Sequence, residues 1–191
     1  MIIYFDGASY GFVKDSNKLL LTYGVLLHNG SEEPVEIHGK HLVARHYKGN
    51  HEMIAFLESF KLLKEQNIDC KKVSFYTDSQ EMVDAQFILH PENNKELRKD
   101  KFLVSLKHSL KLLKITDSLD EVIDCLLNSR FVKIKGHNNT VDNIRVDHLT
   151  RHAYKNTTPK KYDDFLKCTA INGVLFPFVE KKQKENKIKL D

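Results

Sequence analysis

The sequence predicts an α/β fold in which helices flank a mixed sheet of five strands, three antiparallel strands first and then parallel ones. Three strand-like segments come first in the chain, and helical and strand-like segments then alternate, which is typical of such a sheet. Length agrees, because 191 residues with 41% hydrophobic and 29% charged side chains suit one globular domain with an extension.

Apolar residues define the first half of the predicted order. Residues 2–9, 19–28 and 33–44 are the first three strands, and Asn29-Gly30 between the last two is a hairpin signal. Residues 50–66 form the first helix, because apolar side chains recur there at intervals of three and four. A fourth strand is expected at residues 71–78.

The second half continues the alternation. A helix follows Ser79 to about residue 89, where a Pro-containing stretch breaks the pattern. Residues 95–114 form a long amphipathic helix, and Ser118 with Glu121 is a capping-box pattern that opens a helix to residue 127. The last strand and helix are residues 130–136 and 140–154.

Three regions follow from this order. Residues 1–155 form the globular domain, residues 156–180 are an apolar segment that packs on it or on a partner subunit, and residues 181–191 are a Lys-rich tail. The tail is expected to be solvated.

Composition excludes several classes of protein. No uncharged apolar stretch reaches the ~20 residues of a transmembrane helix, and the N-terminus lacks the features of a secretory signal. We therefore expect a cytoplasmic protein with no membrane partner. Cys70, Cys125 and Cys168 lack a C-x-x-C pair and are odd in number, which argues against a disulfide framework and a thiolate zinc site. The net charge of +4 permits a phosphate-bearing partner without requiring one.

Two carboxylates stand at the ends of apolar strands. Asp6 follows Ile-Ile-Tyr-Phe, and Asp78 follows Val-Ser-Phe-Tyr-Thr. If these strands are parallel neighbours, both acids emerge at the carboxyl edge of the sheet, where open α/β sheets bind ligands. The alternative is that each acid caps the turn that follows it.

A third carboxylate, Glu52, shares the core-facing stripe of the first helix. On a wheel of ~100° per residue, Glu52 lies about 40° from Phe56, whereas Glu58 and Glu65 fall on the opposite side, which we expect to be solvated. The helix dipole stabilises an acid in the first turn but does not require it to point inward. We therefore interpret Glu52 as functional.

A fourth segment, Lys-Gly-His followed by Asn143 and Asp147, completes an ordered set. Its polar helical stripe alone would indicate only a solvated face. With the strand ending in Asp6-Gly-Ala, the inward Glu52 and Tyr-Thr-Asp78-Ser, however, it resembles the type 1 ribonuclease H family over about residues 1–155. His137 and Asp147 have the spacing of that family's terminal motif.

The resemblance implies a ribonuclease H-like catalytic domain at residues 1–155 that hydrolyses the RNA strand of RNA–DNA hybrids, leaving 5′-phosphate and 3′-hydroxyl ends. Asp6, Glu52, Asp78 and Asp147 would hold two Mg²⁺ ions, for which Mn²⁺ is a substitute, because hard cations prefer oxygen ligands. His137 would handle protons or assist product release, since imidazole changes charge near neutral pH. A monomer that binds the hybrid is expected.

Contacts to nucleic acid are also implied. The family pattern assigns them to the loops and helix starts around the acids, and a basic handle is expected on the predicted helix 95–114. The set is Gly7, Ala8, Asn50, Ser79, Asn143, Lys107, Lys111 and Lys114. The lysines alternatively form an ordinary surface face. The family's paired Asn is reduced here to Asn50, which can equally be a helix N-cap, and the chain has no Trp.

Three other functions stay open. One is a catalytically silent hybrid-binding module, and the second is a nuclease of the same fold that acts on DNA or structured nucleic acid. The third is a histidine–metal hydrolase built on His148-x-x-x-His152 or His38-x-x-His41, for which the sequence shows neither a third ligand nor the Glu of a zinc protease.

Overall fold

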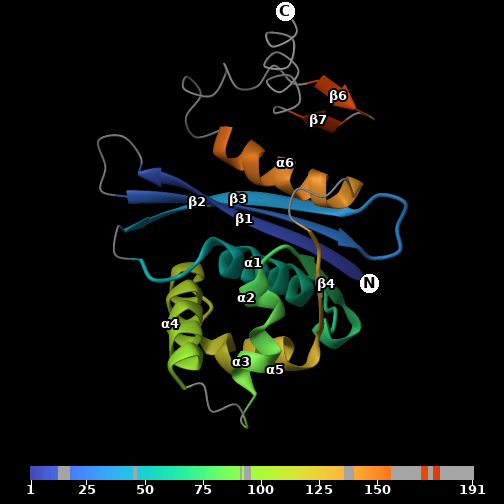
Figure 1. Ribbon diagram of the computed structural model, residues 1–191. Coiled ribbons are helices and arrows are strands. Elements are labelled where there is room, and N and C mark those ends of the chain that lie inside the picture. The colour runs from blue at the N-terminus through green and yellow to red at the C-terminus, as the bar shows by residue number, and fades with distance from the viewer. Residues whose placement is uncertain are drawn as a thin grey trace, which may run out of the picture.

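The computed structural model describes residues 1–12, 18–44, 47–90, 92, 96–135, 140–155, 169–171 and 174–176. Within these residues, a five-stranded sheet has helices on both faces (Figure 1). The strand order is β3-β2-β1-β4-β5, in which β3, β2 and β1 are antiparallel and β4 and β5 run parallel to β1. The predicted fold class is confirmed.

The elements follow the predicted order closely. The strands of the sheet are β1 (Ile2–Phe12), β2 (Lys18–His28), β3 (Val35–Ala44), β4 (Ser74–Thr77) and β5 (Arg130–Lys133). The helices are α1 (His51–Glu65), α2 (Gln80–Val83), α3 (Ala85–Leu89), α4 (Glu96–Leu113), α5 (Leu119–Asn128) and α6 (Val141–Lys155), with short 3-10 turns η1 (Cys70–Lys72) and η2 (Thr116–Ser118). The predicted turn at Asn29-Gly30 is present, and Gly30 has a φ of 97°.

The structure differs from the sequence prediction at three places. The strand predicted from residue 71 begins at Ser74, because the Asp69 side chain accepts from the Lys71 amide and caps η1. The helix predicted after Ser79 is divided at Asp84 into α2 and α3. The capping box predicted at Ser118 is wrong: that side chain makes no cap hydrogen bond, and Glu121 instead pairs with Lys64 at 2.6 Å.

An aromatic cluster joins α1 to the sheet. Phe56 of α1 packs against Phe5 of β1 and Phe75 of β4, with ring centroids 6.0 and 5.5 Å apart, and Phe75 stacks on Phe131 of β5 at 5.1 Å. Phe5, Phe56 and Phe75 are fully buried. The predicted apolar stripe of α1 is therefore the core side of the helix.

Glu58 is buried, and the prediction that it faces solvent is wrong. His41 Nε2 of β3 lies 3.1 Å from one carboxylate oxygen, and Lys61 Nζ lies 2.9 Å from the other. Burial alone would raise the pKa of Glu58, but hydrogen bonds from these two partners outweigh burial and lower it. A helical wheel of α1 contains no information about β3, which supplies the partner. Glu65 is exposed, as predicted.

Helix α6 lies on the face of the sheet opposite α1, over β1, β2 and β3 (Figure 1). Gly24 of β2 permits this approach, because a Cβ there would lie 2.7 Å from the Val146 carbonyl oxygen and 2.9 Å from Thr150 Oγ1. The Thr150 hydroxyl also lies 3.4 Å from the carbonyl oxygen of Asp6. The position of α6 relative to Asp6 is thus fixed by direct backbone contact.

The C-terminal predictions lie largely outside the described residues. Strands β6 (Thr169–Ile171) and β7 (Val174–Phe176) form a separate antiparallel pair, and β7 lies near α6. The packing role of residues 156–180 stays a prediction, and the tail at 181–191 is not among the described residues. Among the helices that are described, none combines the length and apolarity needed to cross a membrane.

Gly24→Ala is expected to lower the free energy of unfolding by about 1–3 kcal/mol, the usual effect of overpacking a close contact. Urea denaturation measures the change. The control is Leu42→Ala on β3, because Leu42 is 49% exposed, and its effect should stay within about 0.5 kcal/mol. Wild-type stability of Gly24→Ala would contradict the close approach of α6 to β2.

Candidate active site

The register of two parallel strands places Asp6 beside Asp78. Ile2 of β1 pairs with Ser74 of β4, and Tyr4 pairs with Tyr76. Two residues further along each chain, the same register brings Asp6 opposite Asp78, which directly follows the end of β4. The expectation that both acids emerge at one edge of the sheet is confirmed.

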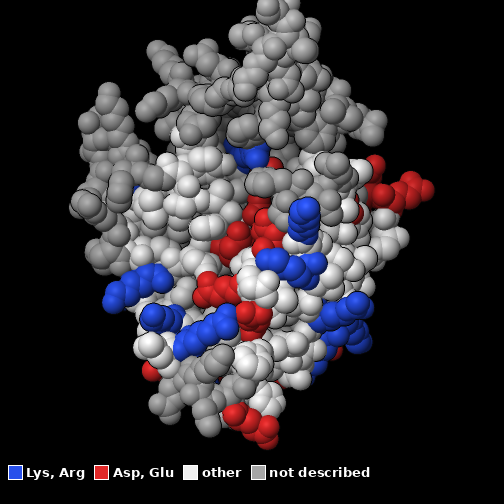
Figure 2. Space-filling view, in the orientation of Figure 1, with Lys and Arg blue, Asp and Glu red and all other residues white. Residues whose placement is uncertain are grey.

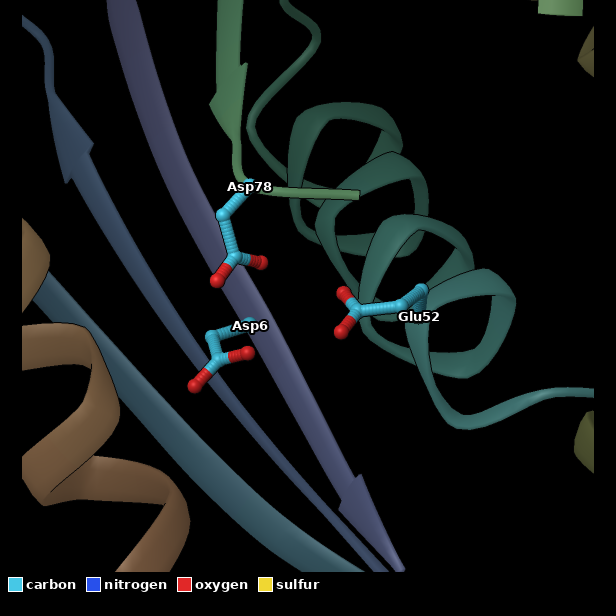
Figure 3. A group of neighbouring side chains, drawn as sticks. All are labelled: Asp6, Glu52 and Asp78. Atoms are coloured by element: carbon cyan, nitrogen blue, oxygen red, sulfur yellow. The ribbon is translucent and has the colours of Figure 1, made fainter. Parts of the chain in front are cut away.

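Gly7 allows Glu52 to join this pair. A Cβ on Gly7 would lie 2.3 Å from the carbonyl oxygen of His51, so only glycine lets the first turn of α1 lie directly on β1. Glu52 therefore enters the site from the helix while Asp6 enters from the strand, and Figure 3 shows the three carboxylates directed toward one another. The Glu52 side chain is 13% exposed.

The three carboxylates form a compact oxygen cluster. One oxygen from each of Asp6, Glu52 and Asp78 lies within 4.8 Å of the others. Among the described residues, Oε2 of Glu52 is buried and has no hydrogen-bond partner. Such an atom is a candidate ligand for a cation, because an unsatisfied buried carboxylate oxygen is destabilising.

The cluster works against its own ionisation. Burial first, and then the charges of Asp147 and Asp78, raise the pKa of Asp6 to about 8. Burial, followed by the charges of Asp6 and Asp78, raises the pKa of Glu52 well above its usual value. The Gly7 amide opposes both shifts by hydrogen bonding. Because each shift disfavours the ionised form, a divalent cation that compensates the charge would favour ionisation.

Asp147 stands beside the cluster on α6. Its charge is among the causes that raise the pKa of Asp6, after burial, so it faces the same site. Arg151, one turn further along α6, lies 2.6 Å from an Asp147 carboxylate oxygen. The structure thus groups three of the four predicted acids within ligand distance and holds the fourth next to them.

Two further predicted residues are on or before α6. Asn143 is half-buried, one turn before Asp147. His137 belongs to residues 136–139, which lie outside the described part of the chain, so its role stays a prediction.

Asn50 is a helix N-cap in this structure. Its Oδ1 accepts from the Met53 amide at 2.6 Å, and its Nδ2 donates to Glu81 Oε2 at 2.6 Å. Both ends of the amide group are therefore engaged within the protein. To contact a nucleic acid, Asn50 Nδ2 would have to give up its hydrogen bond to Glu81.

The other predicted contact residues surround the acids. Ser79 caps α2, where its hydroxyl accepts from the Met82 amide at 3.4 Å. Gly7 is buried under α1, and Ala8 is half-buried. Direct contact with nucleic acid stays a prediction for each of them.

The amphipathic character predicted for α4 is present. Its apolar stripe is buried, including Phe102, Leu106 and Leu110, whereas Lys107 and Lys111 are exposed. Lys114 is exposed just beyond the end of the helix, with a φ of 59°. Figure 2 shows carboxylates gathered in the middle of one face of the molecule, with Lys and Arg around them.

Sequence reasoning missed two residues that border the cluster. Lys133 Nζ donates to the Asp78 carbonyl at 2.6 Å, and His51 Nε2 lies 3.8 Å from Glu52 Oε1. Burial lowers the pKa of His51, although the charge of Asp78 opposes this shift. Lys133 is the last residue of β5, the strand parallel to β4. A lysine at the carboxyl end of a parallel strand could therefore have been predicted to lie at the same edge of the sheet as Asp78.

Comparison with known proteins identifies the family. The RNase H family model matches residues 1–155. A search of curated proteins found no match.

Several solved structures are similar to this chain at low sequence identity. RNase H1 from the halophilic archaeon Halobacterium salinarum is 19% identical, covers 81% of this chain and 97% of its own, and has a TM-score of 0.47. LC11-RNase H1, isolated from compost by a metagenomic approach and solved in complex with an RNA/DNA hybrid, is 19% identical over 81% of this chain and 96% of its own, with a TM-score of 0.48. The protease–reverse transcriptase of prototype foamy virus is 20% identical over 80% of this chain and 20% of its own, with a TM-score of 0.48.

The family match covers the whole of the five-stranded sheet and all of the predicted acids. The chain therefore belongs to the RNase H family and is a ribonuclease H.

Proposed function

We propose that the protein hydrolyses the RNA strand of RNA–DNA hybrids by two-metal-ion catalysis, leaving 5′-phosphate and 3′-hydroxyl ends. The observation that carries this proposal is the cluster of Asp6, Glu52 and Asp78, brought within 4.8 Å from a strand, a helix and a second strand. The free thiols of Cys70 and Cys125 suit a reducing, cytoplasmic setting.

The cluster fits divalent cations. It offers only oxygen donors, which Mg²⁺ prefers, and the buried Oε2 of Glu52 lacks a partner among the described residues. Asp6, Glu52, Asp78 and Asp147 would hold two Mg²⁺ ions, or Mn²⁺ in their place. When bound, such a pair of ions activates water and stabilises the leaving oxygen of a phosphodiester.

The residues of the chain divide the remaining work. The charges of both Asp147 and Asp78 act on Asp6, so Asp6 would be the carboxylate that both ions share. Arg151 orients the Asp147 carboxylate through their ion pair. Lys133 places a positive charge beside Asp78, where it attracts the phosphate backbone. His137 accepts or releases protons as product leaves.

Hybrid recognition rests on the surroundings of the acids. Gly7, Ala8, Ser79 and Asn143 lie on the elements that carry the acids, and the exposed lysines of α4 extend the surface with positive charge. A protein distinguishes RNA from DNA through the 2′-hydroxyl. The engaged amide of Asn50 favours one second candidate, a nuclease of the same fold with a preference for DNA.

Cleavage of matched substrates separates these candidates. A labelled RNA–DNA hybrid, duplex DNA and duplex RNA of one sequence are incubated with Mg²⁺, Mn²⁺ or a chelator. We expect metal-dependent cleavage of the RNA strand of the hybrid alone. Cleavage of DNA would favour the second candidate, and binding of the hybrid without cleavage would indicate a silent binding module.

Asp6→Asn and Asp78→Asn are each expected to reduce cleavage at least about a thousandfold, because loss of a metal ligand removes several kcal/mol of transition-state stabilisation. Hybrid binding and the circular dichroism spectrum should persist. Asp117→Asn, an exposed acid in η2, is the control and should cleave normally. Near-normal turnover by Asp78→Asn would refute the assigned site.

The metal-free protein is expected to lose stability as pH rises from about 4 to about 8. The pKa of Asp6 is about 8 in the fold and about 3.9 in an unfolded chain. The protonated Asp6 side chain therefore contributes its full stabilisation of the fold below a pH of about 3.9. This contribution is lost as the pH rises through about 8. Glu52 acts in the same direction.

Thermal denaturation in chelator measures this effect. The melting temperature of Asp6→Asn should exceed that of the wild type by a margin that grows with pH. When Mg²⁺ replaces the chelator, the melting temperature of the wild type should rise more than that of the variant. A margin that is constant from pH 4 to 8 would contradict the burial and repulsion inferred for Asp6.

Replacement of Lys107, Lys111 and Lys114 together by Ala is expected to weaken hybrid binding and reduce its salt dependence. Each lost phosphate contact flattens the log–log slope by roughly 0.9. Replacement of Lys71 and Lys72 of η1, which precede β4 and therefore lie at the opposite edge of the sheet from Asp78, is a control that removes two exposed charges. An unchanged salt slope in the triple variant would remove α4 from the binding surface.

A further inference from the structure

We propose that His38, His148 and His152 form a site for a divalent transition-metal ion of the zinc class, separate from the carboxylate cluster and located where α6 crosses β3. The sequence contains two closely spaced histidine pairs, His38 with His41 and His148 with His152. In the structure His38 contacts His152 instead of His41. His38 comes from β3, whereas His148 and His152 are one turn apart on α6.

The first two ligands already have the required separation. His38 Nε2 lies 3.2 Å from His152 Nδ1, and the two rings are nearly perpendicular, with an interplanar angle of 87° and centroids 4.9 Å apart. Nitrogens that share a tetrahedral zinc ion at 2.0–2.1 Å are about 3.3 Å apart. One ion can therefore replace the hydrogen bond between these rings with little movement of either backbone.

His148 supplies a third nitrogen from the same side of the helix. Side chains four residues apart on a helix are neighbours, and a pair of histidines at this spacing is a recurrent zinc chelate. His148 is half-buried and lies one helical turn before His152 on α6. A bound ion would gain this third ligand by rotation of the His148 side chain toward the pair formed by His38 and His152.

The surroundings favour metal binding over proton binding at His38. Burial, and then the charge of His152, lowers the pKa of His38, whereas the charge of Glu36 opposes this shift. Neutral imidazole is the form that binds a metal. Glu36 lies two residues before His38 on the same side of β3 and forms an ion pair with Arg145 of α6, so charged side chains of both elements border the inferred site.

The donor types separate this site from the carboxylate cluster. Imidazole nitrogens suit Zn²⁺, Cu²⁺ and Ni²⁺, whereas Mg²⁺ prefers the oxygens of Asp6, Glu52 and Asp78. The chain lacks the Glu that a zinc hydrolase carries between its helical histidines, and His41 points to Glu58 instead of to His38. The inferred role is therefore to clamp α6 onto β3, not to perform a second reaction.

Zinc binding by the full chain tests this proposal. Equilibrium dialysis with Zn²⁺ is performed in millimolar Mg²⁺, which occupies the carboxylate cluster. The wild type is compared with His38→Gln, His152→Gln and the control His90→Gln, an exposed histidine outside the inferred site. Circular dichroism verifies that each variant is folded.

We expect the wild type to bind one equivalent of zinc. His38→Gln and His152→Gln should each lower the zinc affinity at least about tenfold, because loss of an outer-shell partner of a metal already lowers affinity by about that factor. Zn²⁺ should raise the melting temperature of the wild type and of His90→Gln, but not of the other two variants. Equal zinc affinity of the wild type, His38→Gln and His152→Gln would overturn the proposal, as would a melting-temperature rise that survives in both.

Discussion

The repulsion between buried carboxylates is the constraint on which this structure depends. Burial and the neighbouring charges raise the pKa values of Asp6 and Glu52, because the fold holds both groups close to each other and to Asp78, and the charge of Asp147 also acts on Asp6. A fold that needed only stability would separate these acids or pair them with cations. Their proximity is explained by ligands that bring positive charge, and it connects the packing of the sheet to the chemistry of phosphodiester cleavage.

Backbone geometry, more than side-chain pairing, holds the acids together. The parallel register of β1 and β4 sets Asp6 beside Asp78, and the missing side chain of Gly7 lets α1 deliver Glu52. On the other face, α6 approaches β2 through Gly24 and carries Asp147 toward Asp6. These contacts are made by main-chain atoms that cannot move without moving a whole strand or helix. The positions of the carboxylates are therefore set by the backbone.

The sequence predicted what depends on local pattern and left out what depends on distant partners. Period predicts the sheet, and strand endings mark Asp6 and Asp78 as candidates, because burial leaves a period in the chain and a strand that ends on an acid is visible in it. The ordered resemblance to a family was needed to join them with Glu52 in one site. Glu58 was misjudged, since its partner His41 comes from another element. Lys133 was missed because its partner, the carbonyl of Asp78, also belongs to another part of the chain. The capping box at Ser118 was wrong because Glu121 pairs with Lys64 of α1 instead.

Anomalous diffraction from crystals soaked in Mn²⁺ tests the central claim most directly, because it locates the ions independently of activity. The account predicts two anomalous peaks in contact with oxygens of Asp6, Glu52 and Asp78, one of them also in contact with Asp147. Loss of these peaks in Asp6→Asn would agree with that assignment. Carboxylates that stay apart under saturating Mn²⁺, with no peak among them, would contradict it.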